Sequence, residues 1–193
     1  APALRPLTLA QVGAAVGAPL DRLVPPGPVV LGGHSMGGMT IMALAAARPQ
    51  LFGDRVRGVA LVSTGAGDLT SDPKSASGRM AKLSPRMLNV ALAGAWVTER
   101  LRQLVPPEHP RHQKMVRSLL YGTDASDEIV LAGAEIMHAS TVRAFTEFLP
   151  ALGDHDKAAE LAALSRVPVE ILVGDTDKLT PKKHSRTLAE VLP

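Results

Sequence analysis

The sequence predicts an α/β fold, in which a parallel β-sheet is flanked by helices and carries an inserted helical lid. Three short apolar runs, rich in β-branched residues, predict strands over 29–31, 57–63 and 168–173. Helical patterns lie before the first run, after it and after the third. Residues 66–166 show no convincing strand and carry helical patterns instead. Wholly apolar runs of this kind are typical of strands that are buried on both faces of a sheet.

The first helix is predicted from its capping residues and its apolar spacing. Thr8 stands three residues before Gln11, which is the arrangement of a capping box. Apolar residues then recur at spacings of three and four, as on one face of a helix: Leu9, Val12, Val16, Leu20 and Leu23. Pro19 should kink or split this helix, and Pro25 should end it.

Two more helices belong to the same sheet. The run MTIMALAAAR follows the first strand and stops at Pro49. Thr180 followed by Pro181 predicts an N-cap with proline at the first helical position, so a closing helix should span 181–192. Strand, helix and strand at this spacing predict right-handed crossovers, and therefore parallel strands.

The long segment between the second and third strands is interpreted as a lid. One of its helices should start at Ser84, a second should cover about 127–138, and a third should run from Ser140 to Leu149. The segment PPEHPRHQK is interpreted as a proline-rich loop between them. We therefore expect three parts in the chain, with 1–65 and 167–193 forming the core and 66–166 forming the lid.

The composition excludes several classes of function. The 193 residues contain no cysteine, so no disulfide, thiolate nucleophile or cysteine metal site is available. Lysine and arginine exceed aspartate and glutamate by only three, without a basic block, which disfavours a nucleic-acid partner. No secretory signal or membrane-length apolar run stands out, so we expect no integral membrane segment and a cytoplasmic location.

The motif GGHSMGGM predicts a catalytic serine. Gly33 to Gly37 matches G-x-S-x-G, with a strand before it and a helix after it, as a nucleophile elbow requires. Ser35 would sit on a sharp, strained turn, where Gly33 and Gly37 are small enough to avoid collision. The helix that follows would direct its first amides at the same point, so the N–H of Met36 is the expected oxyanion donor.

Two other interpretations of this motif are weaker. A glycine-rich turn can cradle a phosphate, but the lysine of a phosphate loop and the spaced glycines of a dinucleotide site are both missing. His34 is the immediate neighbour of Ser35 on a tight turn, so its imidazole should point away from the Ser35 hydroxyl. A structural role is expected for this histidine.

Three segments resemble the α/β-hydrolase superfamily, particularly its esterases and lipases: VVLGGHSMGGMTIMALAAARPQLF, VRGVALVSTGAG and VPVEILVGDTDKLTPKKHSRTLAEVLP. The resemblance implies a serine hydrolase that cleaves carboxylic esters or related acyl bonds without a cofactor. It also implies that the triad acid follows the strand after the lid, which is Asp177 here. Asp175 and Asp68 are competing positions for this acid.

The base that this mechanism needs is not evident in the chain. Family order places a histidine after the acid, beyond one more strand. The histidine at 184 follows Asp177 closely, within a predicted helix, and should pack there, whereas His138 and His155 precede the acid. His109 and His112 are spaced to bind metal but lack a third ligand, so no metal site is expected.

The segments that precede and follow this sequence in the family would supply what is missing. We therefore interpret the chain as an internal fragment that lacks the N-terminal strands, the second oxyanion donor and the catalytic histidine, and expect it to be nearly inactive alone. Apolar lid residues favour a small hydrophobic acyl substrate, although they could equally pack lid helices together: Met80, Met87, Trp96, Met137, Phe145 and Phe148. A cofactorless haloperoxidase and a non-catalytic binding relative are the alternatives, and the oligomeric state stays open.

Overall fold

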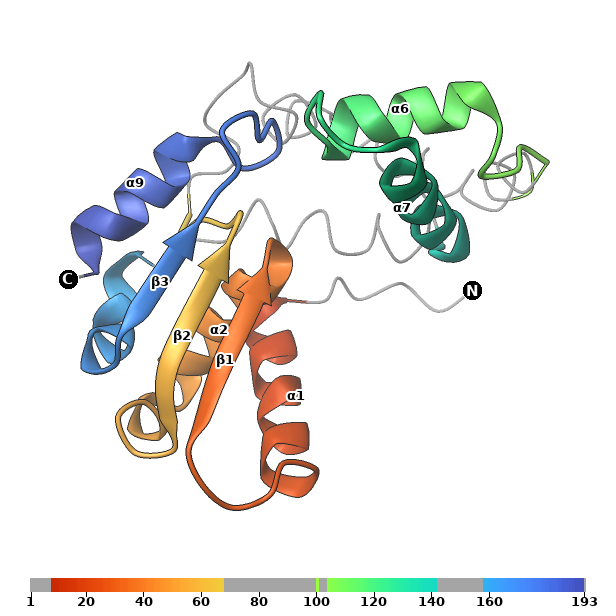
Figure 1. Cartoon of the computed structure of the whole chain (residues 1–193). Coiled ribbons are helices and arrows are strands. Elements are labelled where there is room, and N and C mark those ends of the chain that lie inside the picture. The colour runs from red at the N-terminus through yellow and green to blue at the C-terminus, as the bar shows by residue number, and fades with distance from the viewer. Residues whose placement is uncertain (1–7, 68–99, 101–103, 142–157, 193) are drawn as a thin grey trace, which may run out of the picture.

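One parallel sheet organises the molecule. The computed structural model describes residues 8–67, 100, 104–141 and 158–192. The sheet has the order β1-β2-β3, formed by β1 (Val29–His34), β2 (Val56–Val62) and β3 (Val169–Leu172). Both pairings are parallel, and the register places Val62 between His34 and Leu172. The predicted α/β class and parallel pairing are confirmed, and all three strands end at the same edge (Figure 1).

In the described residues, helices pack on one face of this sheet, and two more lie beyond the ends of its strands. The helical elements are α1 (Leu9–Arg22), α2 (Met36–Ala47), η1 (Pro49–Leu51), α6 (Pro110–Leu120), α7 (Asp127–Ala139), η2 (Ala158–Arg166) and α9 (Lys182–Val191). Helix α2 contacts β1, α1 and η2, while α9 contacts β3 and η2. The α6–α7 pair lies at the end of the molecule toward which the strands point (Figure 1).

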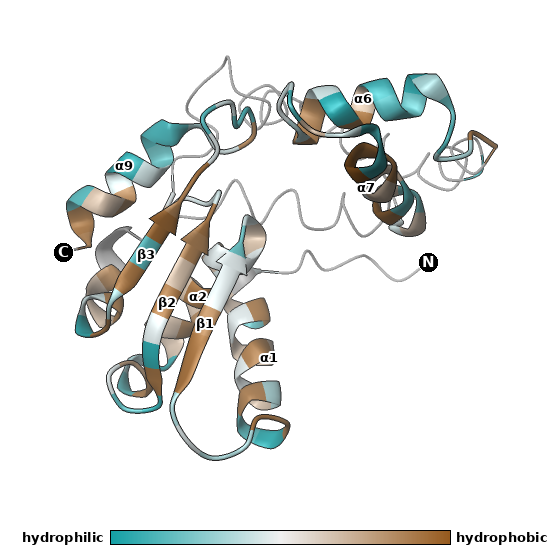
Figure 2. Ribbon diagram, in the orientation of Figure 1, coloured by the Kyte–Doolittle hydropathy of each residue, from teal (hydrophilic) through white to brown (hydrophobic). Residues whose placement is uncertain are grey.

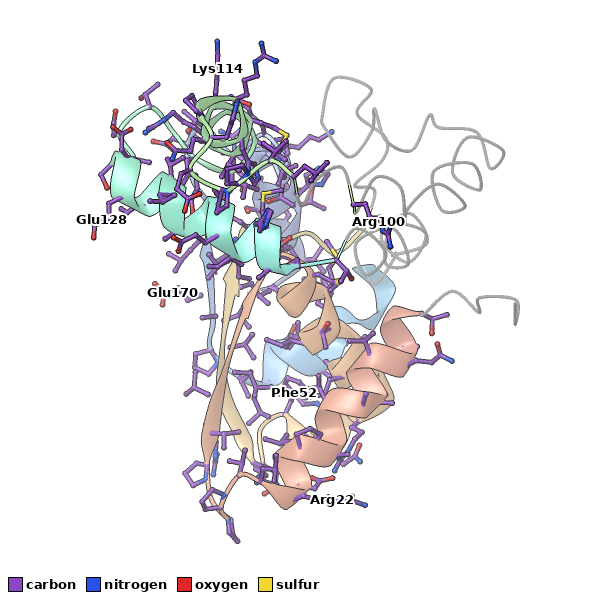
Figure 3. All side chains as sticks on the ribbon, turned by 90° about the vertical axis from the view of Figure 1, so that its right-hand side faces the viewer. Arg22, Phe52, Arg100, Lys114, Glu128 and Glu170 are labelled. Carbon is purple, nitrogen blue, oxygen red and sulfur yellow. The ribbon has the colours of Figure 1, made fainter. Side chains whose placement is uncertain are left out.

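The core lies between the sheet and the helices on one of its faces. Helix α2 is buried from Gly38 to Ala45 because the sheet, α1 and η2 surround it, which explains why it is apolar on all sides. Phe52 points into this layer, whereas Glu170 points away from it on the other side of the sheet (Figure 3). Leu44, Leu61, Leu164 and Leu188 are fully buried members of the same core.

The other face of the sheet is exposed, so the expectation that the strands are buried on both faces was wrong for the described residues. Val30 of β1 is 71% exposed and Leu172 of β3 is 47% exposed. Figure 2 shows apolar residues along all three strands. A wholly apolar strand is compatible with burial on both faces of a sheet. The apolar pattern does not show which residues pack against each face.

Helix α1 agrees with its predicted capping. Thr8 and Gln11 form the reciprocal capping box, with hydrogen bonds of 3.0 and 3.2 Å. Pro19 does not split the helix, which continues to Arg22 and is closed by a 2.8 Å bond from the Leu23 amide to the Pro19 carbonyl. Packing of α1 on α2 keeps the segment helical despite the missing N–H.

Two other helix boundaries differ from the prediction. The segment read as a proline-rich loop contains the start of α6, with His109 as its N-cap and Pro110 as its first residue. Pro181, not Thr180, occupies the N-cap position of α9 and makes no capping hydrogen bond with its side chain, while the Thr180 hydroxyl bonds to Asp177. The predicted helix over 127–138 is confirmed by α7.

Helices α6 and α7 pack on each other through a small apolar cluster. Val116 of α6 is buried against Val130 and Ala134 of α7, with Met137 packed beside them. Met137 therefore packs against the cluster between α6 and α7, which agrees with the packing role that was one of its two expected roles. The predicted lid helix near Ser84 and the acid candidate Asp68 lie outside the described residues. Of the predicted helix at 140–149, only residues 140 and 141 are described.

Within the described ranges, no helix has the length and apolar character needed to cross a membrane.

Candidate active site

Ser35 occupies a strained turn between β1 and α2. Its backbone angles are φ 52° and ψ −118°, and it directly follows the last residue of the strand. A positive φ is uncommon for a residue with a side chain, and strained residues of this kind concentrate at functional sites. The Ser35 amide donates a 2.9 Å hydrogen bond to the carbonyl of Val62, which fixes the turn to the neighbouring strand.

Close contacts show which glycines the turn needs. A Cβ atom at Gly33 would lie 2.6 Å from the backbone of Gly37, where α2 begins to turn away from the strand. A Cβ atom at Gly38 would lie 2.6 Å from the side chain of Thr64. A Cβ atom at Gly37 would meet nothing within 4 Å, so the crowding expected at this residue falls on Gly38 instead.

The start of α2 lies directly beside Ser35. Met36 is the first residue of this helix, so its N–H belongs to the first turn, where amides lack an intrahelical acceptor. The carbonyl of Ser35 accepts bonds from the amides of Gly38 and Met39, at 3.0 and 3.4 Å. The positive end of the helix dipole therefore faces the same region as the serine.

Asp177 lies in the loop that follows β3, at the same edge of the sheet. One of its carboxylate oxygens accepts bonds from the amides of Leu179 and Thr180, at 2.9 and 2.8 Å, and the other accepts a 2.9 Å bond from the Thr180 hydroxyl. The Ser63 hydroxyl, just after β2, also bonds to this carboxyl group. Asp177 is therefore held by its own turn and by a neighbouring strand end.

These contacts keep Asp177 ionised. Partial burial raises its pKa, but the bonds from Thr180, Ser63 and Leu179 favour the charged form and together hold the pKa below its ordinary value. Asp175, two residues earlier, is exposed, and its pKa is lowered by the hydrogen bond and charge of Lys182, 2.6 Å away. Asp175 does not line the cavity described next.

A cavity of about 350 Å³ brings the two predicted catalytic residues together. Ser35 and Ser63 contribute from the strand ends, and Gly174 and the acid loop from 176 to 180 form one side. The opposite side comes from the end of α6 and the following residues, 119–122. The cavity thus lies between the carboxyl edge of the sheet and the end of α6, as expected for a site at the ends of parallel strands.

The histidines of the described chain lie mostly elsewhere. Among the described residues that line the cavity, the only histidine is His34, which directly precedes Ser35. His109 caps α6, and the buried ring of His112 lies 6.2 Å from the ring of His138. His184 is buried in α9, and His155 lies outside the described residues. No set of three or more potential metal-ligating side chains occurs in the described parts of the chain.

Three polar residues of this site were not predicted as site residues from the sequence. Ser63, Thr64 and Thr180 bond to the acid or to the elbow through their hydroxyl groups. Ser63 and Thr64 could have been found, because they are the last residue of the predicted strand 57–63 and the residue after it, and this strand neighbours β1. Thr180 was assigned to the cap of α9, which is the ordinary role of threonine before proline at a helix start.

A second, larger hollow of about 1000 Å³ lies at the other end of the sheet. It is lined by residues 21–28, together with Asp54, Arg55 and Arg57. One guanidinium nitrogen of Arg55 bonds to the carbonyls of Leu20 and Val24, at 2.8 and 2.9 Å. Arg55 therefore serves to hold the loop between α1 and β1, and this hollow is separate from the elbow.

The chain belongs to the alpha/beta hydrolase family, whose model matches residues 1–193. A comparison with curated proteins finds no match. Among solved structures, a bromoperoxidase from Bacillus anthracis is 16% identical with a TM-score of 0.67 and is matched over 100% of this chain and 66% of its own. A thermophilic esterase from Thermogutta terrifontis is 21% identical with a TM-score of 0.63, over 97% and 61% of the two chains.

An enol-lactonase from Burkholderia xenovorans LB400 is also 21% identical, with a TM-score of 0.60, over 97% of this chain and 62% of its own. The chain therefore spans less than two thirds of the length of these structures. At such identities the likeness shows only that the fold is shared. The parallel sheet and the strand-to-helix turn at Ser35 agree with that fold.

Proposed function

We propose that the protein is a serine hydrolase that cleaves carboxylic esters or related acyl bonds through an acyl-enzyme. Ser35 is the nucleophile, Asp177 the acid that orients a histidine, and the N–H of Met36 one oxyanion donor. The observation that carries this proposal is that the strained Ser35 and the ionised Asp177 line one cavity. Membership of the alpha/beta hydrolase family supports it.

The chemistry follows from the geometry of the elbow. The Ser35 hydroxyl would attack the acyl carbon, and the negative charge that develops on the carbonyl oxygen would be stabilised by the Met36 N–H at the start of α2. A histidine would take the serine proton and later give it to the leaving alcohol. Water would then attack the acyl-enzyme and release the acid.

Asp177 is suited to hold such a histidine. One of its two oxygens accepts both amide bonds, the other accepts the Thr180 hydroxyl, and the Ser63 hydroxyl also bonds to this carboxyl group. An imidazole N–H would take the place of the Ser63 hydroxyl. Of the described histidines only His34 lines the cavity, and it directly precedes Ser35 as the last residue of β1. A neighbour on so tight a turn is not expected to reach the Ser35 hydroxyl. We expect the base to come from outside the described residues.

The test is the Ser35→Ala variant in the intact protein. Short p-nitrophenyl esters and a fluorophosphonate probe, which labels activated serines, report hydrolysis and nucleophilicity separately. Loss of the nucleophile should lower turnover by about 10⁴ to 10⁶ and abolish labelling. Ser140→Ala, at the end of α7 and outside the cavity lining, is the matched control and should leave both readouts unchanged.

The outcomes separate the proposal from its alternatives. Undiminished hydrolysis in Ser35→Ala would remove this serine from the mechanism. An intact wild-type protein that shows neither hydrolysis nor labelling would favour a non-catalytic binding role for the same cavity.

A further inference from the structure

One side of α6 is buried near the middle of the helix and lines the cavity at its end. His112 and Val116, one turn apart, are buried, and Val116 packs on α7. The stripe continues to Leu119 and Leu120, but these side chains are 37% and 43% exposed and line the cavity. An uncovered pair of leucines opposite a nucleophile provides apolar surface that a bound acyl group would cover.

The end of α6 is tied to the loop that carries the acid. Lys178 donates a 3.0 Å hydrogen bond from Nζ to the carbonyl of Ser118, in the last turn of the helix. A second close approach lies four residues later, where a Cβ atom at Gly122 would be 3.2 Å from Oγ1 of Thr176. One hydrogen bond and one close approach therefore join the cavity wall at 119–122 to the acid loop.

The chemistry of the first contact favours this arrangement. The last carbonyls of a helix lack intrahelical donors and carry the negative end of its dipole, so an ammonium group stabilises them. The Arg117 carbonyl already accepts a 3.1 Å bond from the Tyr121 amide, and Lys178 supplies a donor for the next carbonyl along, that of Ser118. The loop that bears Lys178 is itself fixed by the hydrogen bonds of Asp177.

We propose that Lys178 is a positioning residue that fastens the end of α6 to the acid loop and so makes the enzyme selective for short acyl chains. This inference rests on the proposed function. The fastened wall leaves about 350 Å³, near the lower end of the range of about 300–1,000 Å³ that ligand sites occupy. Release of the wall would let Leu119 and Leu120 move outward and would admit longer chains.

The fastening is tested without reference to catalysis, by amide hydrogen exchange. In Lys178→Met, the amides of residues 119–124 should exchange about three- to tenfold faster, because loss of one net hydrogen bond lets the helix end open more often. Lys178→Arg keeps a cationic donor and should restore most of the protection. Lys182→Met is the matched control, since Lys182 pairs with Asp175 and does not contact α6 through a described hydrogen bond.

Selectivity is then measured in the intact enzyme with p-nitrophenyl butyrate and decanoate. Lys178→Met should lower the preference for butyrate, as the ratio of kcat/KM values, by about tenfold, mainly through a lower KM for decanoate. Lys178→Arg should keep the wild-type ratio, and so should Lys182→Met. A purely structural role would change both esters equally.

Different results would overturn the fastening role of Lys178, its link to selectivity and the proposed function. Unchanged exchange at 119–124 in Lys178→Met would overturn the fastening role whatever the enzyme hydrolyses. Faster exchange with an unchanged ester ratio would overturn the link to selectivity. Hydrolysis that persists in Ser35→Ala would defeat the proposed function, while the exchange result would still decide the role of Lys178.

Discussion

The side-chain hydroxyl of Thr64 donates a 2.8 Å hydrogen bond to the backbone carbonyl of Ser35. Thr64 is only 1% exposed and follows β2, so it reaches the strained turn from the neighbouring strand. Its methyl group also lies only 2.6 Å from the position that a Cβ atom of Gly38 would take. One buried threonine thus secures the elbow by a hydrogen bond and by close packing.

Replacing this hydroxyl should loosen the elbow. Thr64→Val keeps the shape and removes the donor, and should lower the free energy of unfolding by about 1 kcal/mol, the usual net worth of such a bond. Urea denaturation measures this change, and fluorophosphonate labelling of the intact protein should slow with it. Thr187→Val, which removes an exposed bond to the Lys183 carbonyl, should have a smaller effect on stability and none on labelling.

A glycine series tests the packing around the elbow. Gly33→Ala and Gly38→Ala should each destabilise the protein by about 1–3 kcal/mol, because the new Cβ atoms would lie 2.6 Å from backbone or buried side-chain atoms. Gly37→Ala should be neutral or stabilising, because it has open space and gains helix propensity. Thermal unfolding gives the order, and a destabilised Gly37→Ala would contradict the contacts described here.

The strands and the elbow could be predicted because their signals are local. A short β-branched run ended by Gly-x-Ser-x-Gly specifies a strand, a strained turn and a helix within a few residues. The position of Asp177 could be predicted from the family resemblance together with the rule that parallel strands end at one edge. The observed sheet and cavity bring Ser35 and this carboxylate to the same place.

Features that depend on distant packing could not be predicted in this way. The segment around Pro110 was read as a loop, because prolines there obscured a helix start that uses His109 as its cap. The cavity wall at 119–122 depends on where α6 lies relative to the acid loop, which no local pattern encodes. The open face of the sheet was missed for the same reason, since an apolar strand does not reveal its neighbours.

Asp177 should contribute to the pH dependence of stability. Its pKa is lowered in the folded chain, so its contribution is fully present above the unfolded value of about 3.9 and is lost as the pH falls through the folded value. In that window the unfolded chain binds more protons. Asp177→Asn should therefore lower the free energy of unfolding at pH 7 and flatten its decline below about pH 4.

The exposed Asp175 provides the comparison for this measurement. Its pKa is also lowered, through Lys182, but solvent and salt screen such a surface pair. Asp175→Asn should change the acid limb less, and added salt of about 0.5 M should remove that change while leaving the effect of Asp177→Asn in place. Equal salt sensitivity of the two variants would contradict the role of the hydrogen bonds from Thr180 and Leu179.

The exposed apolar face of the sheet should promote self-association of the 193-residue chain. Val30 and Leu172 project from this face, at 71% and 47% exposure, and exposed apolar patches tend to self-associate. The double variant Val30→Thr, Leu172→Thr makes this face more polar, and threonine is β-branched, so it remains favourable in a strand. The variant should have a lower apparent mass than the wild type when light scattering is measured at high protein concentration. Leu23→Thr, in the loop after α1 and 80% exposed, is the control that should leave association unchanged. Equal association in the double variant and the wild type would show that this face is not the surface involved.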